Sequence, residues 1–303
     1  MFILNRFIFL PLLIGLCCNC KKSEKNTAST KVLQSETTKT IQTQNVVFES
    51  EGVNLAGTVY IPAKPLAALV LVNGSDQTPR MAELGEFLAE NGMLVITYDK
   101  RGVGESGGIY VGPQVGTNNI SFENLNLLAR DANAAVATLK KFNSDLPLGF
   151  LGFSQAGWII PIAASQNHQI DFMALFSCPI ITTLEQLRFQ FYTNGDADFW
   201  NSHTEEDARE HVKNDPDRYQ FAPTDPKESL KNLSIPGLWL FGEQDIQIPV
   251  KVCIEQLNNF RLSNKPFEYV LFPELGHNTN KGEPLNITLN WIKRQALIIQ
   301  NSK

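Results

Sequence analysis

The feature that most constrains this 303-residue chain is an apolar run at 148–153 that breaks at a serine and resumes as helix-compatible sequence. The break reads Gly152-Phe153-Ser154-Gln155-Ala156-Gly157. A strand that enters a helix through so tight a turn needs small residues two positions either side of its centre, and Gly152 and Ala156 are small. The hydroxyl of Ser154 would then project from the end of the strand. The first N–H groups of the helix point to the same place, where they can stabilise an oxyanion.

Such turns are frequent, so a nucleophilic serine is supported only if a base and an acid follow it. His277 follows a strand-like run at 267–273, and Gly276 before it permits a turn that aims the imidazole back over a sheet. We therefore predict His277 as the base. The other histidines lie at a helix end or in polar, charged sequence, where solvated positions are expected: His168, His203 and His211.

The acid is expected in the loop that leaves a second buried-type strand at 237–242. Asp245 is our candidate, because a carboxylate there can accept the Nδ1 proton of His277, fix its tautomer and stabilise the imidazolium. Glu243 lies in the same loop and is the reserve candidate, since spacing alone cannot rank the two carboxylates.

The chain order Ser154, Asp245, His277 is that of the α/β-hydrolase superfamily, which the chain resembles from about Val46 to its end. Four segments are similar to a bacterial group of serine hydrolases labelled esterase or dienelactone-hydrolase-like: 53–58, 98–106, 152–158 and 242–245. The resemblance implies an α/β-hydrolase fold with a mostly parallel central sheet, helices on both faces and a small helical cap. Ala156 stands where glycine is commoner, and Asn73-Gly74 stands where many relatives carry His-Gly.

An oxyanion hole needs two donors. The N–H of Gln155 is the first. The second is expected after the strand-like run at 69–72, which ends in Asn73-Gly74-Ser75, so the N–H of Ser75 is our candidate and Gly74 is the next. The substitution of His-Gly by Asn-Gly leaves the hole to backbone N–H groups, for which side-chain identity matters less.

A glycine-rich segment, Gly102-Val103-Gly104-Glu105-Ser106-Gly107, matches the dinucleotide-binding fingerprint and follows a strand-like run at 93–98. That fingerprint opens directly into a helix whose N-terminus holds the pyrophosphate. Here the chain continues as Gly108-Ile109-Tyr110-Val111-Gly112-Pro113, which cannot be that helix. Nucleotide binding is not expected, and in the relatives this loop lies near the rim of the active site.

The segment 45–303 has the length of one α/β domain. A hairpin around Glu51-Gly52 begins it, and strands near 69, 93, 148, 172, 237 and 267 alternate with helices near 80, 122, 155, 249 and 284. Residues 181–235 interrupt the alternation and are expected to form the cap. Aromatic side chains in this insert either pack inside the cap or line an acyl or alcohol pocket, and we favour the pocket slightly: Phe189, Phe191, Tyr192, Phe199 and Trp200.

The first 20 residues predict export, because Arg6 precedes an apolar run of signal-peptide length at 7–16. Cysteines then precede a charged stretch, as in a lipoprotein signal. We expect lipidation at Cys20, with Cys18 and Cys17 as alternatives and ordinary cleavage to a soluble secreted protein as another. Residues 21–44 are too polar to bury a core and are expected to be a flexible tether, which would leave the domain anchored to the membrane.

Composition excludes some partners and cofactors. The net charge of −5 and the lack of a basic stripe disfavour nucleic acid. No metal site or organic cofactor is expected. Cys178 and Cys253 are expected to be buried free thiols, and a disulfide between them is the alternative.

The sequence therefore predicts an exported serine hydrolase that cleaves carboxylic esters through a Ser-His-Asp triad and an acyl-enzyme. A serine peptidase or an acyltransferase could use the same groups, and a non-catalytic binding protein could retain the fold.

Overall fold

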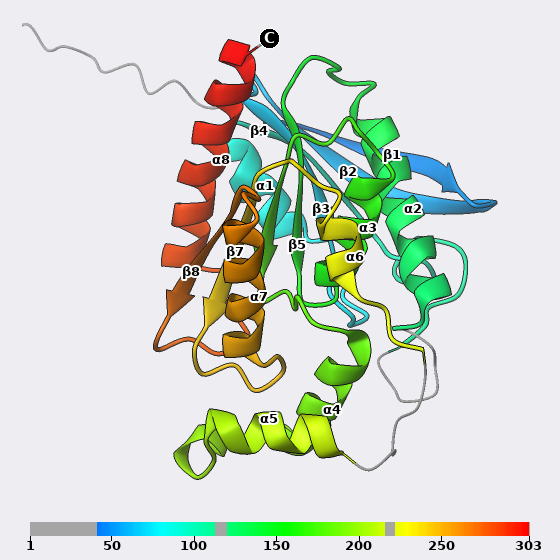
Figure 1. The fold of residues 1–303 in the computed structure, drawn as a ribbon. Coiled ribbons are helices and arrows are strands. Elements are labelled where there is room, and N and C mark those ends of the chain that lie inside the picture. Colours follow the sequence, from blue (N-terminus) through cyan, green and yellow to red (C-terminus); the bar gives the residue numbers. More distant parts are fainter. Residues whose placement is uncertain (1–40, 113–119, 216–221, 303) are drawn as a thin grey trace, which may run out of the picture. The chain divides into compact units, whose positions relative to one another are not determined.

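The described part of the protein is built on one twisted sheet. The structure, a computed structural model, describes residues 41–112, 120–215 and 222–302. The sheet has the strand order β1-β2-β4-β3-β5-β6-β7-β8 (Figure 1). β1 pairs antiparallel with β2 and β2 with β4, whereas all later neighbours are parallel. The strands are β1 (Ile41–Ser50), β2 (Val53–Pro62), β3 (Ala67–Val72), β4 (Met93–Tyr98), β5 (Leu148–Phe153), β6 (Phe172–Phe176), β7 (Gly237–Gly242) and β8 (Phe267–Phe272).

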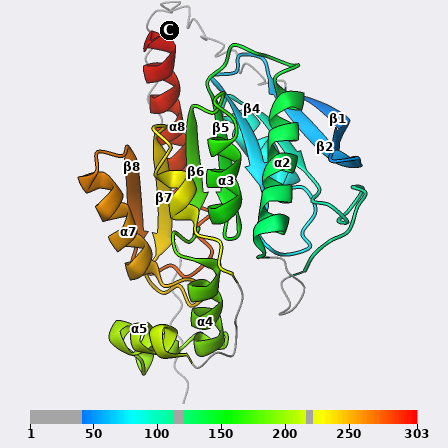
Figure 2. The same cartoon turned by 45° about the vertical axis from the view of Figure 1, so that its right-hand side comes forward.

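Helices cover both faces of the sheet (Figure 2). One face packs against α2 (Phe122–Leu139), α3 (Ala156–Ser165) and α7 (Val250–Leu262), and the other against α1 (Ala82–Glu90) and α8 (Glu283–Ser302). The side chains of β3 alternate between these two cores, so every residue of the strand is buried. A strand covered on both faces needs a continuous apolar run, which is what its sequence Ala-Ala-Leu-Val-Leu-Val provides.

The opening hairpin forms as expected but starts earlier than the sequence suggested. Glu51 and Gly52 both have positive φ, as a two-residue hairpin turn requires. β1 begins at Ile41, inside the segment 21–44 that was expected to be a tether, and Ile41 pairs with Pro62. An edge strand exposes most of its side chains, so polar composition does not exclude it. The expected signal segment 1–20, with Cys17, Cys18 and Cys20, lies outside the described residues.

The described part of the insert between β6 and β7 consists of helices joined by turns and irregular segments. It contains α4 (Thr183–Thr193), a short 3₁₀ turn at Phe199–Asn201, α5 (Glu205–Asn214) and α6 (Pro226–Leu230). α4 and α5 lie beyond the edge of the sheet at which the parallel strands end, whereas α6 lies beside α3 (Figure 1). Leu230 and Leu233 belong to the same core as α3, so the last part of the insert packs with the main domain.

Candidate active site

The turn between β5 and α3 holds Ser154 in an unusual backbone conformation. Its φ is +50°, a region that non-glycine residues rarely occupy and that is found at strained functional turns. A Cβ on Gly152 would lie 2.5 Å from the Cβ of Ala156 and 2.6 Å from Ile160. The strand and the helix therefore approach too closely for any larger residue at 152, as the sequence predicted. Alanine at 156 fits because Gly152 leaves space for its methyl group.

The loops after β7 and β8 approach each other through a second glycine. A Cβ on Gly242 would lie 2.2 Å from the carbonyl oxygens of both Leu275 and Gly276. Gln244 donates its N–H to the carbonyl of Leu275 at 2.9 Å, which joins the two loops. Gly276 itself does not have a positive φ in the structure. The close approach of the two loops thus depends on Gly242, a residue to which the sequence analysis gave no such role.

Asp245 and His277 meet where these loops join. His277 Nδ1 lies 2.8 Å from Asp245 Oδ2, and the Asp245 side chain is fully buried while that of His277 is 14% exposed. The other carboxylate oxygen of Asp245 accepts the N–H groups of Gln247 at 2.7 Å and Ile248 at 3.1 Å. The carboxylate is therefore fixed by its own loop. With Nδ1 engaged, the imidazole can present Nε2 to the cavity.

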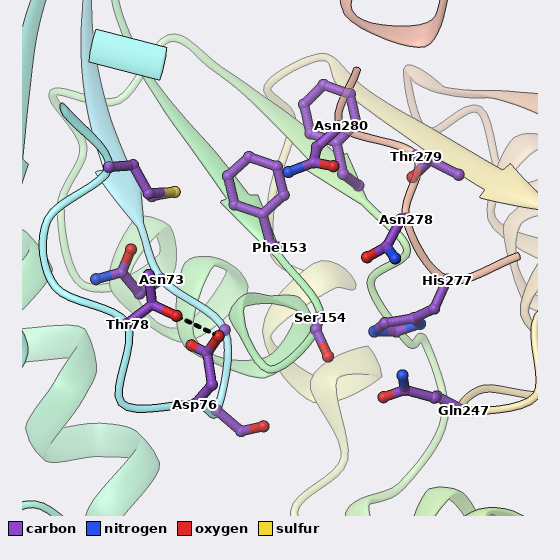
Figure 3. Close-up of a pocket in the computed structure, with 14 residues that line it drawn as sticks. Asn73, Asp76, Thr78, Phe153, Ser154, Gln247, His277, Asn278, Thr279 and Asn280 are labelled. Carbon is purple, nitrogen blue, oxygen red and sulfur yellow. Dashed lines mark hydrogen bonds between the residues drawn. The ribbon is translucent and has the colours of Figure 1, made fainter. Parts of the chain in front are cut away.

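Ser154 and His277 line the same cavity, which has a volume of about 450 Å³. The imidazole of His277 is directed toward the side of Ser154 (Figure 3). The remaining lining side chains are mostly uncharged polar or apolar groups: Asn73, Ser75, Asp76, Thr78, Met81, Phe153, Phe176, Gln247, Asn278, Thr279 and Asn280, with Gly74 completing the wall.

The loop after β3 forms the wall opposite His277 (Figure 3). Both Gly74 and Ser75 line the cavity, and a Cβ on Gly74 would lie 3.6 Å from the Cβ of Ser154. Gln155 begins helix α3 directly after Ser154 and is buried. The structure thus brings both expected oxyanion donors, Gln155 and Ser75, to the surroundings of Ser154.

The loop that carries His277 is fixed to the sheet, and the alternative acid Glu243 lies away from it. Thr279 bonds with Ser177 at 2.9 Å and donates to the carbonyl of Leu240 at 3.2 Å, which ties the His277 loop to the ends of β6 and β7. Glu243, the reserve acid, lines a separate cavity beside Trp200 and Lys251. Among the two carboxylates of this loop, only Asp245 contacts His277 in the described structure.

The aromatic side chains of the insert pack mainly against one another. Phe189 and Phe199 are fully buried, and their rings contact each other and Trp200. His203 stacks on Phe199 with ring centroids 4.2 Å apart, and His211 stacks on Tyr192 at 3.8 Å. None of these residues lines the cavity of Ser154 as the structure describes it, so the pocket role that we favoured for them is wrong. His203 and His211, which were expected to be solvated, are therefore half-buried in the cap. His168 is exposed, as expected.

The glycine-rich segment at 102–107 has a structural role beside the site. It folds around Asp99, whose carboxylate receives the N–H of Glu105 at 2.9 Å and the guanidinium of Arg80 at 2.7 Å. A Cβ on Gly104 would lie 2.5 Å from this carboxylate. Burial raises the pKa of Asp99, but the hydrogen bonds from Arg80 and from the Glu105 amide outweigh it and lower the pKa overall.

Sequence reasoning missed the residues that support the Ser75 loop from behind. Lys100 Nζ donates to the carbonyl of Gly74 at 2.7 Å and to that of Asp76, and Tyr110 donates its hydroxyl to the carbonyl of Ser75 at 2.6 Å. In the sequence, Lys100 was noted only as part of the family-like segment 98–106, and Tyr110 only as part of the sequence that follows the glycine-rich segment. No periodicity or spacing could show that their targets are backbone carbonyls.

Cys178 and Cys253 are both buried and unpaired, as expected. Within 41–112, 120–215 and 222–302, no three His, Cys, Asp or Glu side chains gather as metal ligands would. None of the helices in those ranges is both long and apolar enough to cross a bilayer.

Comparisons with known proteins relate this geometry to a fold. A family described as serine aminopeptidase, S33, matches residues 63–202, a range that includes Ser154 and ends before Asp245 and His277. A search of curated proteins found no match.

Several solved structures share the architecture. An esterase of Pyrococcus furiosus is 18% identical with a TM-score of 0.61, over 84% of this chain and 90% of that one. A putative dienelactone hydrolase of Klebsiella pneumoniae is 17% identical with a TM-score of 0.59, over 85% and 99%. An acylaminoacyl peptidase of Pyrococcus horikoshii is 14% identical with a TM-score of 0.61, over 85% of this chain but 42% of that protein. With the sheet order and crossovers, these likenesses show that the chain has the α/β-hydrolase fold expected from the sequence.

Proposed function

We propose that the protein is a serine hydrolase that cleaves uncharged carboxylic esters of modest size. The observation that carries the proposal is the contact between His277 Nδ1 and the buried Asp245 carboxylate beside a serine held at positive φ. These are the base–acid pair and the exposed nucleophile that acyl transfer through serine requires.

The reaction would proceed in two halves. Ser154 Oγ attacks the ester carbonyl while His277 Nε2 takes the hydroxyl proton, and the imidazolium then protonates the leaving alkoxide. Asp245 keeps the imidazole in the correct tautomer and stabilises its charge. Water, activated by the same imidazole, releases the acid from Ser154. The N–H groups of Gln155 and Ser75 would hold the oxyanion in both tetrahedral intermediates.

The character of the cavity supports an uncharged ester. Its lining offers amide and hydroxyl groups beside Met81, Phe153 and Phe176, a mixture that suits a small substrate with both polar and apolar parts. The printed names of the similar structures, which include an esterase and a dienelactone hydrolase, are compatible with this substrate class.

One observation favours an aminopeptidase as the second candidate. Asp76 is the one carboxylate in the described lining of the cavity, and an exposed carboxylate could bind the ammonium of a peptide N-terminus. The family match carries that activity in its description. Against it, Asp76 already accepts a hydrogen bond from Thr78 at 2.5 Å and interacts electrostatically with Lys100, which reduces its attraction for a second cation.

Turnover of short p-nitrophenyl esters, compared with aminoacyl p-nitroanilides, tests the proposal. We expect ester turnover that depends on Ser154, with Ser154→Ala lowering kcat by about 10⁴- to 10⁶-fold. Ester turnover that survives in Ser154→Ala would contradict the proposal. Efficient anilide turnover that is lost in Asp76→Asn would establish the aminopeptidase instead. An acyltransferase would release acyl product to added alcohols in preference to water.

We further propose that the protein is exported and anchored by a lipid on Cys20. The support is the sequence at 1–22, where an apolar run ends in cysteines and lysines. A diacyl anchor buries two chains at ~0.8 kcal/mol per methylene, so the protein should remain with membranes through high-salt washing. Cys20→Ser should release active protein into the soluble exported fraction. An unmodified mature chain that begins beyond Cys20, identified by mass spectrometry, would instead show a soluble secreted protein.

A further inference from the structure

The loop at 74–76 presents an arrangement that the proposed reaction does not itself require. Three successive carbonyls, those of Gly74, Ser75 and Asp76, accept hydrogen bonds from two side chains of the next loop, Lys100 and Tyr110. The ammonium of Lys100 also lies 5.2 Å from the centre of the Tyr110 ring. We call this arrangement the carbonyl clamp.

Peptide geometry gives the clamp a direction. In a trans peptide the C=O and the N–H point in opposite directions. The peptide between Gly74 and Ser75 offers its carbonyl to Lys100, so its N–H, which belongs to Ser75, points away from Lys100. Gly74 and Ser75 line the cavity on the side of Ser154. Fixing the carbonyl therefore aims the N–H that we assign to the oxyanion.

The charge of Lys100 adds to the geometry. A cation that binds a carbonyl polarises the whole peptide, and hydrogen bonds in series strengthen one another. The N–H of Ser75 thus becomes a stronger donor when Lys100 is protonated. Lys100 is only 6% exposed, so water screens this effect little.

From these contacts we propose that Lys100 is a positioning residue, which aims and polarises the Ser75 N–H of the oxyanion hole through the Gly74 carbonyl, with Tyr110 as its neutral partner. This inference rests on the proposed function. It gives the two residues that flank the glycine-rich segment 102–107 a role in acyl transfer.

The clamp should respond to pH. Burial lowers the pKa of Lys100 to about 8, and the nearby charge of Asp76 opposes that shift. Tyr110 also faces the ammonium, and burial followed by Asp76 raises the pKa of its phenol. Arg80, Asp99 and Glu105 lie in the same pair of loops but pair with one another. As the pH rises through about 8, Lys100 loses its charge, the peptide is less polarised and kcat should fall.

The test compares Lys100→Met with Lys64→Met, which replaces an exposed lysine with no clamp contact. For Lys100→Met we expect kcat for a p-nitrophenyl ester to fall by about 10- to 100-fold while KM changes by less than about 3-fold, since the lost stabilisation is confined to the transition state. The alkaline fall of kcat near pH 8 should disappear. Lys64→Met should keep the wild-type kcat and pH profile.

Amide hydrogen exchange and a charge-conserving variant test the positioning role in two further ways. Amide hydrogen exchange of 73–81 should be faster in Lys100→Met and, to a lesser degree, in Tyr110→Phe, which removes a single oxygen. Lys100→Arg should recover part of kcat without the fall near pH 8, because a guanidinium stays charged.

The outcomes separate the two proposals. An unchanged kcat, or a lowered kcat with the same alkaline fall, would overturn the positioning role. If Lys100→Met does not fold, Tyr110→Phe and Lys100→Arg decide in its place, by the same kcat, pH and exchange readouts. A wild-type protein without ester turnover would refute the proposed function, and unchanged exchange at 73–81 in Tyr110→Phe would then refute the clamp separately.

Discussion

Two loops on opposite sides of the cavity are held in the same way but by different donors. The acid loop, 245–247, offers three successive carbonyls to three side chains of the cap: Trp200 at 3.1 Å, Thr193 at 2.6 Å and Gln186 at 3.1 Å. The loop at 74–76 offers three successive carbonyls to Lys100 and Tyr110. Both loops are irregular backbone at a site that needs fixed geometry, and buried carbonyls there need partners.

The two loops differ in the charge of the side chains that support them and in the group that each directs toward the site. The acid loop presents a side chain, Asp245, and all its supporting donors are neutral. The loop at 74–76 presents a backbone N–H, and its main supporting donor is a cation. We infer that the acid loop keeps its geometry at every pH at which the protein folds, whereas the other loop weakens when Lys100 deprotonates. The cap has a structural role in this comparison. α4 and the 3₁₀ turn supply the donors that fix the acid loop, Gln186, Thr193 and Trp200. The aromatic side chains of both elements form the core that holds these donors in place.

Of the changes that distinguish the two loops, one in the acid loop should have the largest effect. Asp245→Asn should lower kcat by about 10⁴-fold, because an amide favours the wrong tautomer of His277. Glu243→Gln is the matched control, since Glu243 lies in the same loop but lines a different cavity, and it should cost less than about tenfold. Steady-state kinetics with one p-nitrophenyl ester measures both. A crippled Glu243→Gln beside an active Asp245→Asn would reverse the assignment.

A second effect concerns the far end of the Ser75 loop, where Arg80 binds the buried Asp99. Asp99→Asn should destabilise the fold by roughly 1.5–3 kcal/mol, because the buried carboxylate loses its charged hydrogen bond to Arg80, which keeps Glu105 as a second partner. Glu105→Gln, which removes the exposed partner of Arg80, should cost less than about 1 kcal/mol. Denaturant unfolding at neutral pH measures the difference.

The pH dependence of that difference has a definite sign. Because the net pKa of Asp99 is lowered in the folded protein, its stabilisation is present above the ordinary carboxyl range and is lost as the pH falls through the folded pKa. The deficit of Asp99→Asn should therefore shrink at acid pH. An equal deficit at all pH values would show that the mutation acts through packing and not through the ion pair.

The same contrast separates what the sequence could predict from what it could not. The sequence could predict that Ser154, Asp245 and His277 lie around one cavity, because residue type, strand ends and chain order carry that signal. The support of the Ser75 loop could not be found, because any side chain with a donor can reach a carbonyl and the reach depends on tertiary geometry. The cap aromatics were misassigned for a related reason: spacing does not show whether Phe199 faces a substrate or His203. Similarly, the polar start of β1 looked like a tether because edge strands need no apolar pattern.

The smallest effect is expected from a neutral donor of the cap. Thr193→Val removes the hydroxyl that binds the carbonyl of Ile246 and keeps the shape of the side chain. A single neutral hydrogen bond contributes about 0.5–1.5 kcal/mol, so both unfolding and kcat should change little. The decisive reading is the pH profile, which should keep its alkaline fall near pH 8 in this variant. Loss of that fall in Thr193→Val would break the distinction between the two loops.

The most direct test of the central claim is the reaction of the protein with a fluorophosphonate, followed by peptide mapping. A serine activated by His277 beside an oxyanion hole should form one stoichiometric adduct on Ser154. The adduct should be absent in Ser154→Ala and strongly slowed in Asp245→Asn. No adduct in the folded wild-type protein would identify a binding protein that retains the fold, and an adduct on another residue would contradict the assignment of Ser154 as the nucleophile.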